Sequence, residues 1–172
     1  QVRTLLDKRR AREEAQRFVV EGVRLVETCL LAGVAPDVAY VTPDLAATPR
    51  GVALLATLRA TCETVDVSDA VLRAMSDTET PQGIVAVVPF LTADGRRQTA
   101  DEWRSAVGGQ WSALVLIIDA IRDPGNLGTL LRSAAGAGVD LVLLAPGTVD
   151  LYNPKVVRAG MGAHFQVPAR HA

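Results

Sequence analysis

The hydrophobic and polar positions of the first 90 residues change repeatedly between a strand-like and a helix-like period. In the stretch from Val23 to Leu31, apolar side chains recur every three or four residues, which predicts a helix that Gly33 ends. Short runs rich in β-branched residues predict strands. In chain order, the pattern predicts a surface helix over 5–17, a strand over 18–22, a helix over 23–31, a strand over 37–42, a helix over 51–60, a strand over 63–68, a short helix over 69–77 and a buried strand over 83–89. This alternation is typical of an α/β domain, here covering residues 1–90.

The pattern changes after this first domain. Residues 91–110 lose strand character and gain charge and glycines, so they predict a linker with a helical turn around Trp103. A second domain is expected over residues 111–172, where the near-continuous apolar run 111–120 predicts a parallel strand buried on both faces. A helix from Pro124, a strand over 140–146 and then a short helix and a last strand are expected to follow. Because so few strands leave a parallel sheet uncovered, we expect this second domain to be incomplete.

Composition narrows the class of protein only slightly. The 172 residues are 49% hydrophobic and carry a formal net charge of −1, so any binding to a polyanion requires a local basic cluster. Cys29 and Cys62, the two cysteines, have no metal-ligand spacing, which predicts neither a metal site nor a disulfide framework. No apolar run approaches the roughly 20 residues of a membrane helix. We therefore expect a cytoplasmic protein without a membrane partner.

The helix expected after the strand 111–120 carries an unusual stripe of small residues. One face is apolar and predicted to pack on the sheet, whereas Gly125, Gly128, Arg132 and Gly136 form a second stripe. Glycine in a helix interior costs roughly 1 kcal/mol, so something is expected to approach this backbone closely. Either another element packs there and Arg132 is solvated, or the stripe borders a pocket in which Asn126, free amide groups and Arg132 bind an anion.

The residues of this helix carry a resemblance to a known family. The segment DPGNLGTLLRSAAGAGVDLVLL, residues 123–144, resembles the first signature of the SpoU (TrmH-type) RNA 2′-O-ribose methyltransferases, N-x-G-x-x-x-R, which Asn126, Gly128 and Arg132 match. The following YNPKVVRAGMGAHFQVP resembles the next family segment, with Gly160 where a serine is usual. FVVEGVRLVETCL and SDTETPQGIVAVV are similar to the ribosomal-protein-like RNA-binding domain that many members carry in front.

The resemblance implies a fold and a function. It implies an α/β protein with a ribosomal-protein-like RNA substrate-binding domain (1–90), a linker (91–110) and the first part of an α/β-knot (SPOUT) methyltransferase domain (111–172). The implied activity is S-adenosylmethionine-dependent 2′-O-ribose methylation of RNA, ribosomal RNA ahead of transfer RNA, by a homodimer. Two further family motifs, which form the trefoil knot around the cofactor, do not occur in these residues. Cofactor-binding residues are therefore expected beyond Ala172, and the 172 residues alone are expected to be inactive.

The resemblance also assigns roles to single residues. It makes Arg132 catalytic, and because guanidinium has a pKa above about 12, stabilising a developing alkoxide or gripping a phosphate is an easier role than acting as a base. Asn126 is expected to orient Arg132 or the ribose, or to cap the helix. Candidate RNA phosphate contacts are Lys8, Arg9, Arg10, Arg12 and Arg17 in the first domain and Lys155 and Arg158 in the second.

Two other interpretations of the sequence stay open. The chain can be a non-catalytic RNA-binding protein that retains only the first half of the methyltransferase fold. It can also be a nucleotide-binding α/β domain of another class, although GNLG matches neither the dinucleotide nor the P-loop fingerprint.

Overall fold

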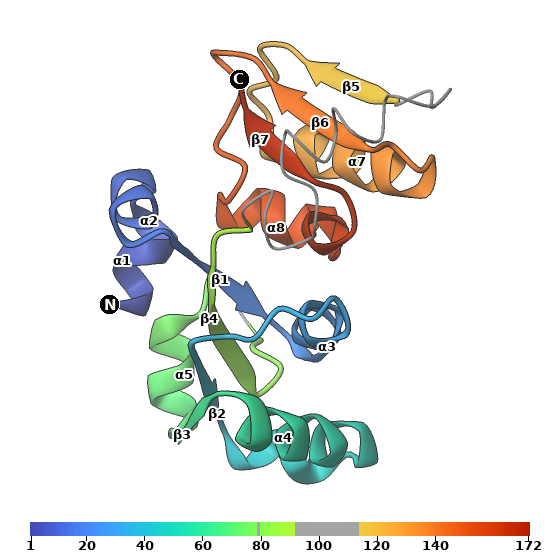
Figure 1. Cartoon of the computed structure of the whole chain (residues 1–172). Helices are drawn as coiled ribbons and strands as arrows, with labels where there is room; N and C mark the ends of the chain where they lie inside the picture. The colour runs from blue at the N-terminus through green and yellow to red at the C-terminus, as the bar shows by residue number, and fades with distance from the viewer. Residues whose placement is uncertain (79, 92–113) are drawn as a thin grey trace. The chain divides into compact units, whose positions relative to one another are not determined.

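The computed structural model describes residues 1–78, 80–91 and 114–172. The chain forms two compact units (Figure 1). Unit 1 comprises Gln1–Phe90 together with Tyr152–Pro154, and unit 2 comprises Leu91–Leu151 and Lys155–Ala172. The predicted linker, apart from Leu91, and the helical turn expected around Trp103 lie outside the described residues.

Unit 1 is built on a four-stranded mixed sheet in the order β1-β4-β2-β3. Strands β2 and β3 are parallel, and β4 runs antiparallel to both of its neighbours, β1 and β2. Among the elements of this domain, the predicted strands and helices other than the first helix are present within a few residues of their expected bounds, and η1 was not predicted. The elements are α1 (Val2–Asp7), α2 (Arg9–Ala15), β1 (Arg17–Glu21), α3 (Val23–Leu31), β2 (Val38–Val41), η1 (Pro43–Ala47), α4 (Pro49–Thr61), β3 (Glu63–Asp66), α5 (Asp69–Met75) and β4 (Ile84–Pro89).

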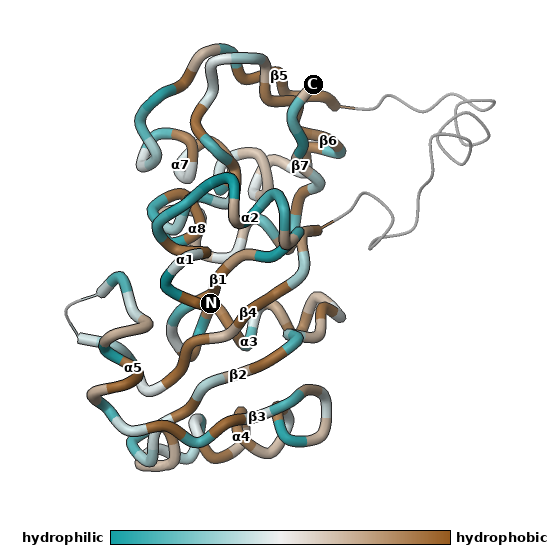
Figure 2. Tube along the Cα trace, turned by 90° about the vertical axis from the view of Figure 1, so that its left-hand side faces the viewer, coloured by the Kyte–Doolittle hydropathy of each residue, from teal (hydrophilic) through white to brown (hydrophobic). Residues whose placement is uncertain are grey.

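The core of unit 1 lies on both faces of β4, the strand predicted to be buried. Five of its six residues are buried, which confirms that prediction. Because side chains alternate along a strand, Val85 and Val87 join a cluster with residues of α1 and α5, while the alternate residues face α3 and α4 (Figure 1). The central strands β4 and β2 are largely hydrophobic, whereas α2 is largely hydrophilic (Figure 2).

Three aromatic rings close one end of unit 1. Tyr152 stacks on Phe90 with ring centroids 4.0 Å apart, and its ring lies 4.7 Å from that of Phe18. This contact explains why Tyr152–Pro154 belongs to unit 1 although its neighbours in sequence belong to unit 2.

The single helix expected over 5–17 is wrong, because Lys8 divides it into α1 and α2. Lys8 adopts an extended backbone with φ −123° and ψ 117°. Arg12 then folds back and donates to the carbonyl oxygens of Leu5 and Leu6, at 2.5 and 3.1 Å, in the last turn of α1. A cation is favoured at a helix C-terminus, where carbonyl groups lack helical partners.

The buried position of Arg12 corrects its expected role as an RNA contact. Its exposed fraction is 3%, so the guanidinium is not available to a phosphate. Arg12 stabilises unit 1, whereas Arg10 in the same helix is exposed and pairs with Glu14.

We expect Arg12→Ala to lower the free energy of unfolding by about 2–4 kcal/mol, because it removes packing and leaves two buried carbonyl groups without their donor. Arg10→Ala, the matched control, changes this free energy by less than about 0.5 kcal/mol, since exposed ion pairs contribute little. Urea denaturation followed by circular dichroism measures both. Equal effects of the two variants would contradict the structural role of Arg12.

Unit 2 contains a parallel three-stranded sheet in the order β5-β6-β7. Its elements are β5 (Val115–Ile118), α7 (Pro124–Gly136), β6 (Leu141–Leu144), α8 (Pro154–Gly160, its first residue assigned to unit 1), η3 (Ala163–Phe165) and β7 (Ala169–His171). The expected β-α-β unit and the parallel sheet are confirmed. As predicted, the apolar stripe of α7 faces the interior of unit 2, where Leu127 and Leu131 are fully buried.

Burial of β5 on both faces was expected, and this expectation is wrong for the described residues. Ile118 is buried, but Ile117 is 67% and Val115 is 42% exposed. β5 is an edge strand of a small sheet, and within the part of the chain that the structure describes no helix covers the outward side chain of Ile117.

Candidate functional site

The start of α7 lies directly after the carboxyl end of β5, the edge at which α/β sheets usually bind ligands. Asp123 caps the helix, since its Oδ1 accepts the backbone N–H of Asn126 at 2.7 Å, and Pro124 occupies the first helical position. The expectation that Asn126 is the cap is therefore wrong. An Asp-Pro pair is a common start of a helix, and this signal in the sequence could have identified the cap.

The side chains of Asn126 and Arg132 are both exposed on α7. In the described part of the chain, neither side chain has a hydrogen bond or an ion pair, and none joins the two. The orientation of Arg132 by Asn126 is thus not present in this structure. Arg132 is a permanent cation that is open to a ligand.

The glycine stripe of α7 serves close packing at one position. A Cβ atom on Gly128 would lie 2.4 Å from the Cβ of Ala159 and 2.8 Å from the backbone N of Gly160, both in α8. No atom lies within 4 Å of the corresponding position at Gly136, and at Gly125 only the carboxylate of Asp123 does. Close helix packing therefore explains Gly128, and the rest of the stripe lies open beside Arg132.

Gly160, the position at which the family resemblance implies a serine, faces the ring of His164. A Cβ atom at this position would lie 2.9 Å from the ring atoms Cε1 and Nδ1 of His164. The ring is buried, with Nε2 2.9 Å from the carbonyl oxygen of Leu151. Burial lowers the pKa of His164 below its ordinary value, against smaller raising effects of Leu151 and Asp150, so the imidazole is neutral near pH 7. The space for a serine side chain is occupied by this imidazole.

The remaining basic candidates are exposed. Lys155 and Arg158 lie three residues apart on α8, whose Val156 and Val157 are buried. Both side chains are therefore accessible to an RNA backbone.

The basic cluster of α1 and α2 is weaker than its sequence indicates. Arg9 and Arg10 are exposed, but each donates to a glutamate four residues later, at 2.7 Å. Arg17 pairs with Asp37. Of the candidates in unit 1, Lys8 is exposed between the two helices without a side-chain hydrogen bond or ion pair to another described residue.

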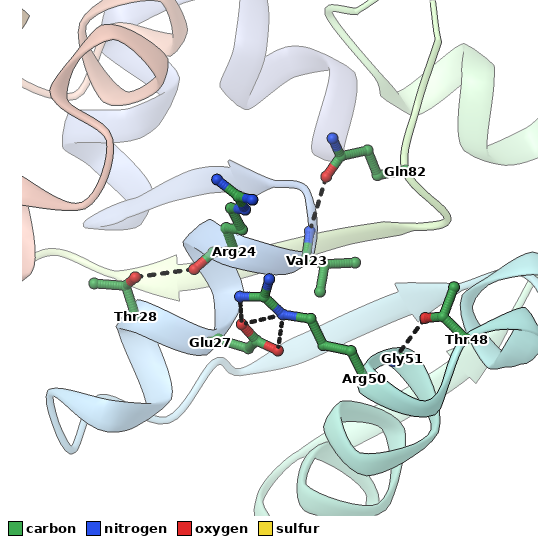
Figure 3. Close-up of polar contacts among 8 residues, drawn as sticks. All are labelled: Val23, Arg24, Glu27, Thr28, Thr48, Arg50, Gly51 and Gln82. Atoms are coloured by element: carbon green, nitrogen blue, oxygen red, sulfur yellow. Dashed lines mark hydrogen bonds and ion pairs between the residues drawn. The ribbon is translucent and has the colours of Figure 1, made fainter.

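One basic residue that sequence reasoning missed lies at the start of α3 (Figure 3). The backbone N–H of Val23 donates to Oε1 of Gln82 at 3.3 Å, which joins the glycine turn before α3 to the turn before β4. Arg50 binds Glu27 through two nitrogen atoms and lowers the pKa of this carboxyl group. Arg24 is exposed beside this pair and, among the described residues, makes no side-chain hydrogen bond or ion pair, although its charge contributes to lowering the pKa of Glu27. The sequence could have indicated Arg24 by its position two residues after Gly22, the glycine that ends the predicted strand 18–22.

The cysteines and acidic residues supply no metal site within the described residues, where no group of three His, Cys, Asp or Glu side chains could hold an ion. Both cysteines are free, and burial raises the pKa of Cys29 to about 12, so its thiol is unreactive at neutral pH. In the same described residues, no helix combines the length and the hydropathy needed to cross a bilayer.

Two family models match the two parts of the chain. The MRM3-like substrate binding domain matches residues 1–86, and the SpoU rRNA Methylase family matches residues 113–172. The chain belongs to the SpoU family. The family resemblance of the N-x-G-x-x-x-R motif and the expected α/β fold are thereby confirmed.

Named relatives agree with this family assignment. The chain is 40% identical over 174 residues to the mitochondrial rRNA methyltransferase 3 of Homo sapiens, covering 97% of this chain and 38% of the relative. It is 33% identical over 164 residues to the 23S rRNA (guanosine(2553)-2'-O)-methyltransferase RlmP of Bacillus subtilis, covering 95% of this chain and 57% of the relative. The chain thus spans well under two thirds of the length of these relatives.

Solved structures of the family have the same fold. An rRNA methyltransferase from Sinorhizobium meliloti superposes with a TM-score of 0.79 at 26% identity, covering 99% of this chain and 60% of that one. The SpoU methyltransferase AviRb of Streptomyces viridochromogenes, solved with AdoMet, gives a TM-score of 0.78 at 28% identity, with 99% and 59% covered.

We expect Gly128→Ala to lower the free energy of unfolding by about 1–3 kcal/mol, because the added methyl group meets α8. Gly136→Ala on the same helix meets open space and raises this free energy by up to about 1 kcal/mol, since alanine favours helix over glycine. Thermal and urea unfolding of the two variants measure the difference. Stabilisation by Gly128→Ala would contradict the close approach of α7 and α8.

We expect buried His164 to make stability depend on acid. Because the pKa of His164 in the folded protein lies below the 6.5 of an exposed imidazole, the unfolded chain binds more protons once the pH falls below about 6.5. Its contribution is therefore complete above this pH and is lost as the pH falls toward the lowered pKa. The melting temperature of His164→Phe should change less between pH 7 and pH 5 than that of the wild type, and parallel profiles would contradict this assignment.

Proposed function

We propose that the whole protein to which these residues belong methylates the 2′-hydroxyl of a ribose in ribosomal RNA, with S-adenosylmethionine as the methyl donor. The observation that carries this proposal is that the N-x-G-x-x-x-R residues lie on α7, the helix that follows the carboxyl end of β5, with the side chains of Asn126 and Arg132 exposed. The names of the human and Bacillus subtilis relatives support ribosomal RNA, and the AdoMet complex of AviRb supports the donor.

The chemistry requires charge stabilisation on the acceptor. S-adenosylmethionine supplies a methyl group on a sulfonium, and the ribose hydroxyl must lose its proton as it attacks. Arg132 stays protonated and can stabilise the developing alkoxide, or hold the adjacent phosphate so that the hydroxyl is aligned. The contact of Gly128 with α8 fixes the helix that carries Arg132, one turn further along. Asn126, exposed in the first turn of α7, is placed to orient the ribose.

The exposed polar groups of α7 suit the binding of the ribose that accepts the methyl group, and not the binding of S-adenosylmethionine. Asn126 and Arg132 are exposed polar side chains on one helix, and they do not form a site for an adenosyl group. We derive no contact with the donor from these residues.

RNA phosphates are the proposed partners of the remaining basic side chains. Lys8, Arg9 and Arg10 in unit 1 and Lys155 and Arg158 in unit 2 are exposed and cationic. Because phosphate contacts release counterions, each is expected to contribute to the salt dependence of RNA binding rather than to its sequence specificity.

Two further properties follow from the family resemblance as proposals, a trefoil knot around the cofactor and a homodimer. A place in the cytoplasm is proposed from the composition and the two cysteines without a disulfide framework. Sedimentation equilibrium of the protein tests the dimer directly.

We expect Arg132→Gln to reduce the rate constant of methyl transfer by about 10²–10³-fold, the typical effect of removing one group that stabilises transition-state charge. Because Arg132 is exposed, the melting temperature should not change. Transfer of a labelled methyl group to ribosomal RNA measures the rate, and Ser133→Ala, an exposed neighbour on α7, serves as the control. RNA binding without methyl transfer by the whole wild-type protein would favour the non-catalytic interpretation.

A further inference from the structure

Met161 is an exposed apolar residue within a segment that is otherwise buried, in the turn between α8 and η3. Its exposed fraction is 61%, whereas residues 160 and 162–165 are all buried. The other large apolar side chains that are exposed in the described part of unit 2 are those of Leu114, Val115 and Ile117, in β5 or directly before it. One exposed methionine is ordinary on a protein surface, so the exposure alone indicates no function.

The backbone of Met161 adopts a conformation that residues with a side chain seldom adopt. Its φ is +47°, in the left-handed region, where the Cβ atom approaches the following carbonyl oxygen. Two other described residues besides glycines have a positive φ, Gln16 and Ala120. Gln16 donates its side-chain amide to the carbonyl oxygen of Glu13 at 2.8 Å, and Ala120 carries only a methyl group. Met161 is the one long apolar side chain among these three.

The contacts on both sides of Met161 hold this turn in place. Its backbone N–H donates to the carbonyl oxygen of Arg158 at 3.2 Å, and Gly160, directly before it, packs against α7. After it, Phe165 donates its backbone N–H to the carbonyl oxygen of Gly162 at 3.0 Å. A glycine at position 161 would make the same turn without strain and without exposed apolar surface. Because strained conformations are concentrated at ligand-binding sites, we take the methionine side chain itself as the feature with a function.

The surface that carries Met161 is cationic. Arg158 is exposed in the turn that ends at Met161, and Lys155 is exposed one turn earlier on α8. The segment 151–172 contains three basic residues and no Asp or Glu. The helix packed against α8, α7, carries the exposed Arg132 one turn after its contact with α8. An apolar side chain among cations suits a polyanion that also presents flat apolar groups, and RNA combines phosphates with bases in this way.

We propose that Met161 contacts an unstacked base of the RNA substrate, beside phosphates bound by Lys155 and Arg158. The polarisable thioether of methionine favours contact with aromatic rings, and proteins that bind nucleic acids insert methionine among other apolar side chains against bases. Bases that are not stacked in a helix are the usual targets of such contacts in RNA. That the ligand is RNA rests on the proposed function, whereas the base contact can be measured without methyl transfer.

The first experiment observes the methyl group of Met161 by NMR in the whole protein, labelled with ¹³C at the methionine methyl groups. The 172 residues contain two methionines, and the other, Met75, is partly buried against the core cluster of unit 1. The variant Met161→Leu assigns the signal. A short single-stranded RNA of mixed sequence should shift the Met161 signal, because a base in contact acts on the methyl group through its ring current. Polyphosphate, which has no bases, should not. The absence of a shift with RNA, or an equal shift with polyphosphate, would overturn the base contact.

Substitution of Met161 should separate stability from RNA binding. Met161→Gly relieves the strain, so the melting temperature should rise by about 1–3 °C, while the affinity for the single-stranded RNA should fall about three- to tenfold. Met161→Leu keeps an apolar side chain and should retain this affinity within about twofold. Ala120→Gly is the control, because it relieves a similar strain, at a φ of +52°, without removing a long side chain. It should raise the melting temperature and leave RNA binding unchanged. Unchanged RNA affinity of Met161→Gly would overturn the proposal.

Two further measurements separate this proposal from its alternatives. If Met161 instead packs against a second copy of the protein, Met161→Gly weakens self-association in sedimentation equilibrium and leaves the RNA affinity of each protomer unchanged, which would overturn the base contact. Methyl transfer to ribosomal RNA is measured separately on the whole wild-type protein. Transfer without a shift of the Met161 signal would reject the base contact and keep the proposed function. A shift without transfer would reject the proposed function and support the base contact.

Discussion

The close approach of α7 and α8 at Gly128 is the contact on which the candidate site of unit 2 depends. With the Cβ atom absent, the two helix backbones meet, and Ala159 and Gly160 pack where a side chain would otherwise stand. This contact sets the position of Arg132 on α7 and of Lys155 and Arg158 on α8. It also brings Gly160 against His164, whose bond to the carbonyl oxygen of Leu151 ties η3 to the segment before α8. A small residue thus holds together the two helices that carry these three cations.

Unit 1 shows that arginines close in sequence can have opposite roles. Arg12 is buried and completes the end of α1, Arg9 and Arg10 are exposed and pair with glutamates, and Arg24 is exposed without such a pair. Burial of an arginine is tolerated where carbonyl groups need a donor, and this need arises only once α1 ends at Lys8. The buried hydroxyl of Thr42, which has no hydrogen-bond partner, is instead at the sheet edge where β2 ends, outside the lysine- and arginine-rich segment of the sequence.

Much of the architecture could be predicted because it follows from local periodicity. The bounds of α3 and the burial of β4 agree with prediction, since a repeat of three to four residues or a continuous apolar run is visible without tertiary information. The break at Lys8 and the exposure of Ile117 could not be predicted. The break at Lys8 depends on the side chain of Arg12 reaching the carbonyl oxygens at the end of α1. The exposure of Ile117 depends on which face of β5 a helix covers.

The sequence by itself determined the family, the alternation of strands and helices, and the motif residues Asn126, Gly128 and Arg132, because each of these is a matter of residue type and spacing along the chain. Only the tertiary structure decided which glycine of α7 packs against α8, which residue caps α7 and which arginine is buried. It also decided that the hydroxyl of Thr42 has no partner. These outcomes depend on atoms from segments brought together by folding, and the distance between such atoms is not encoded in any local pattern.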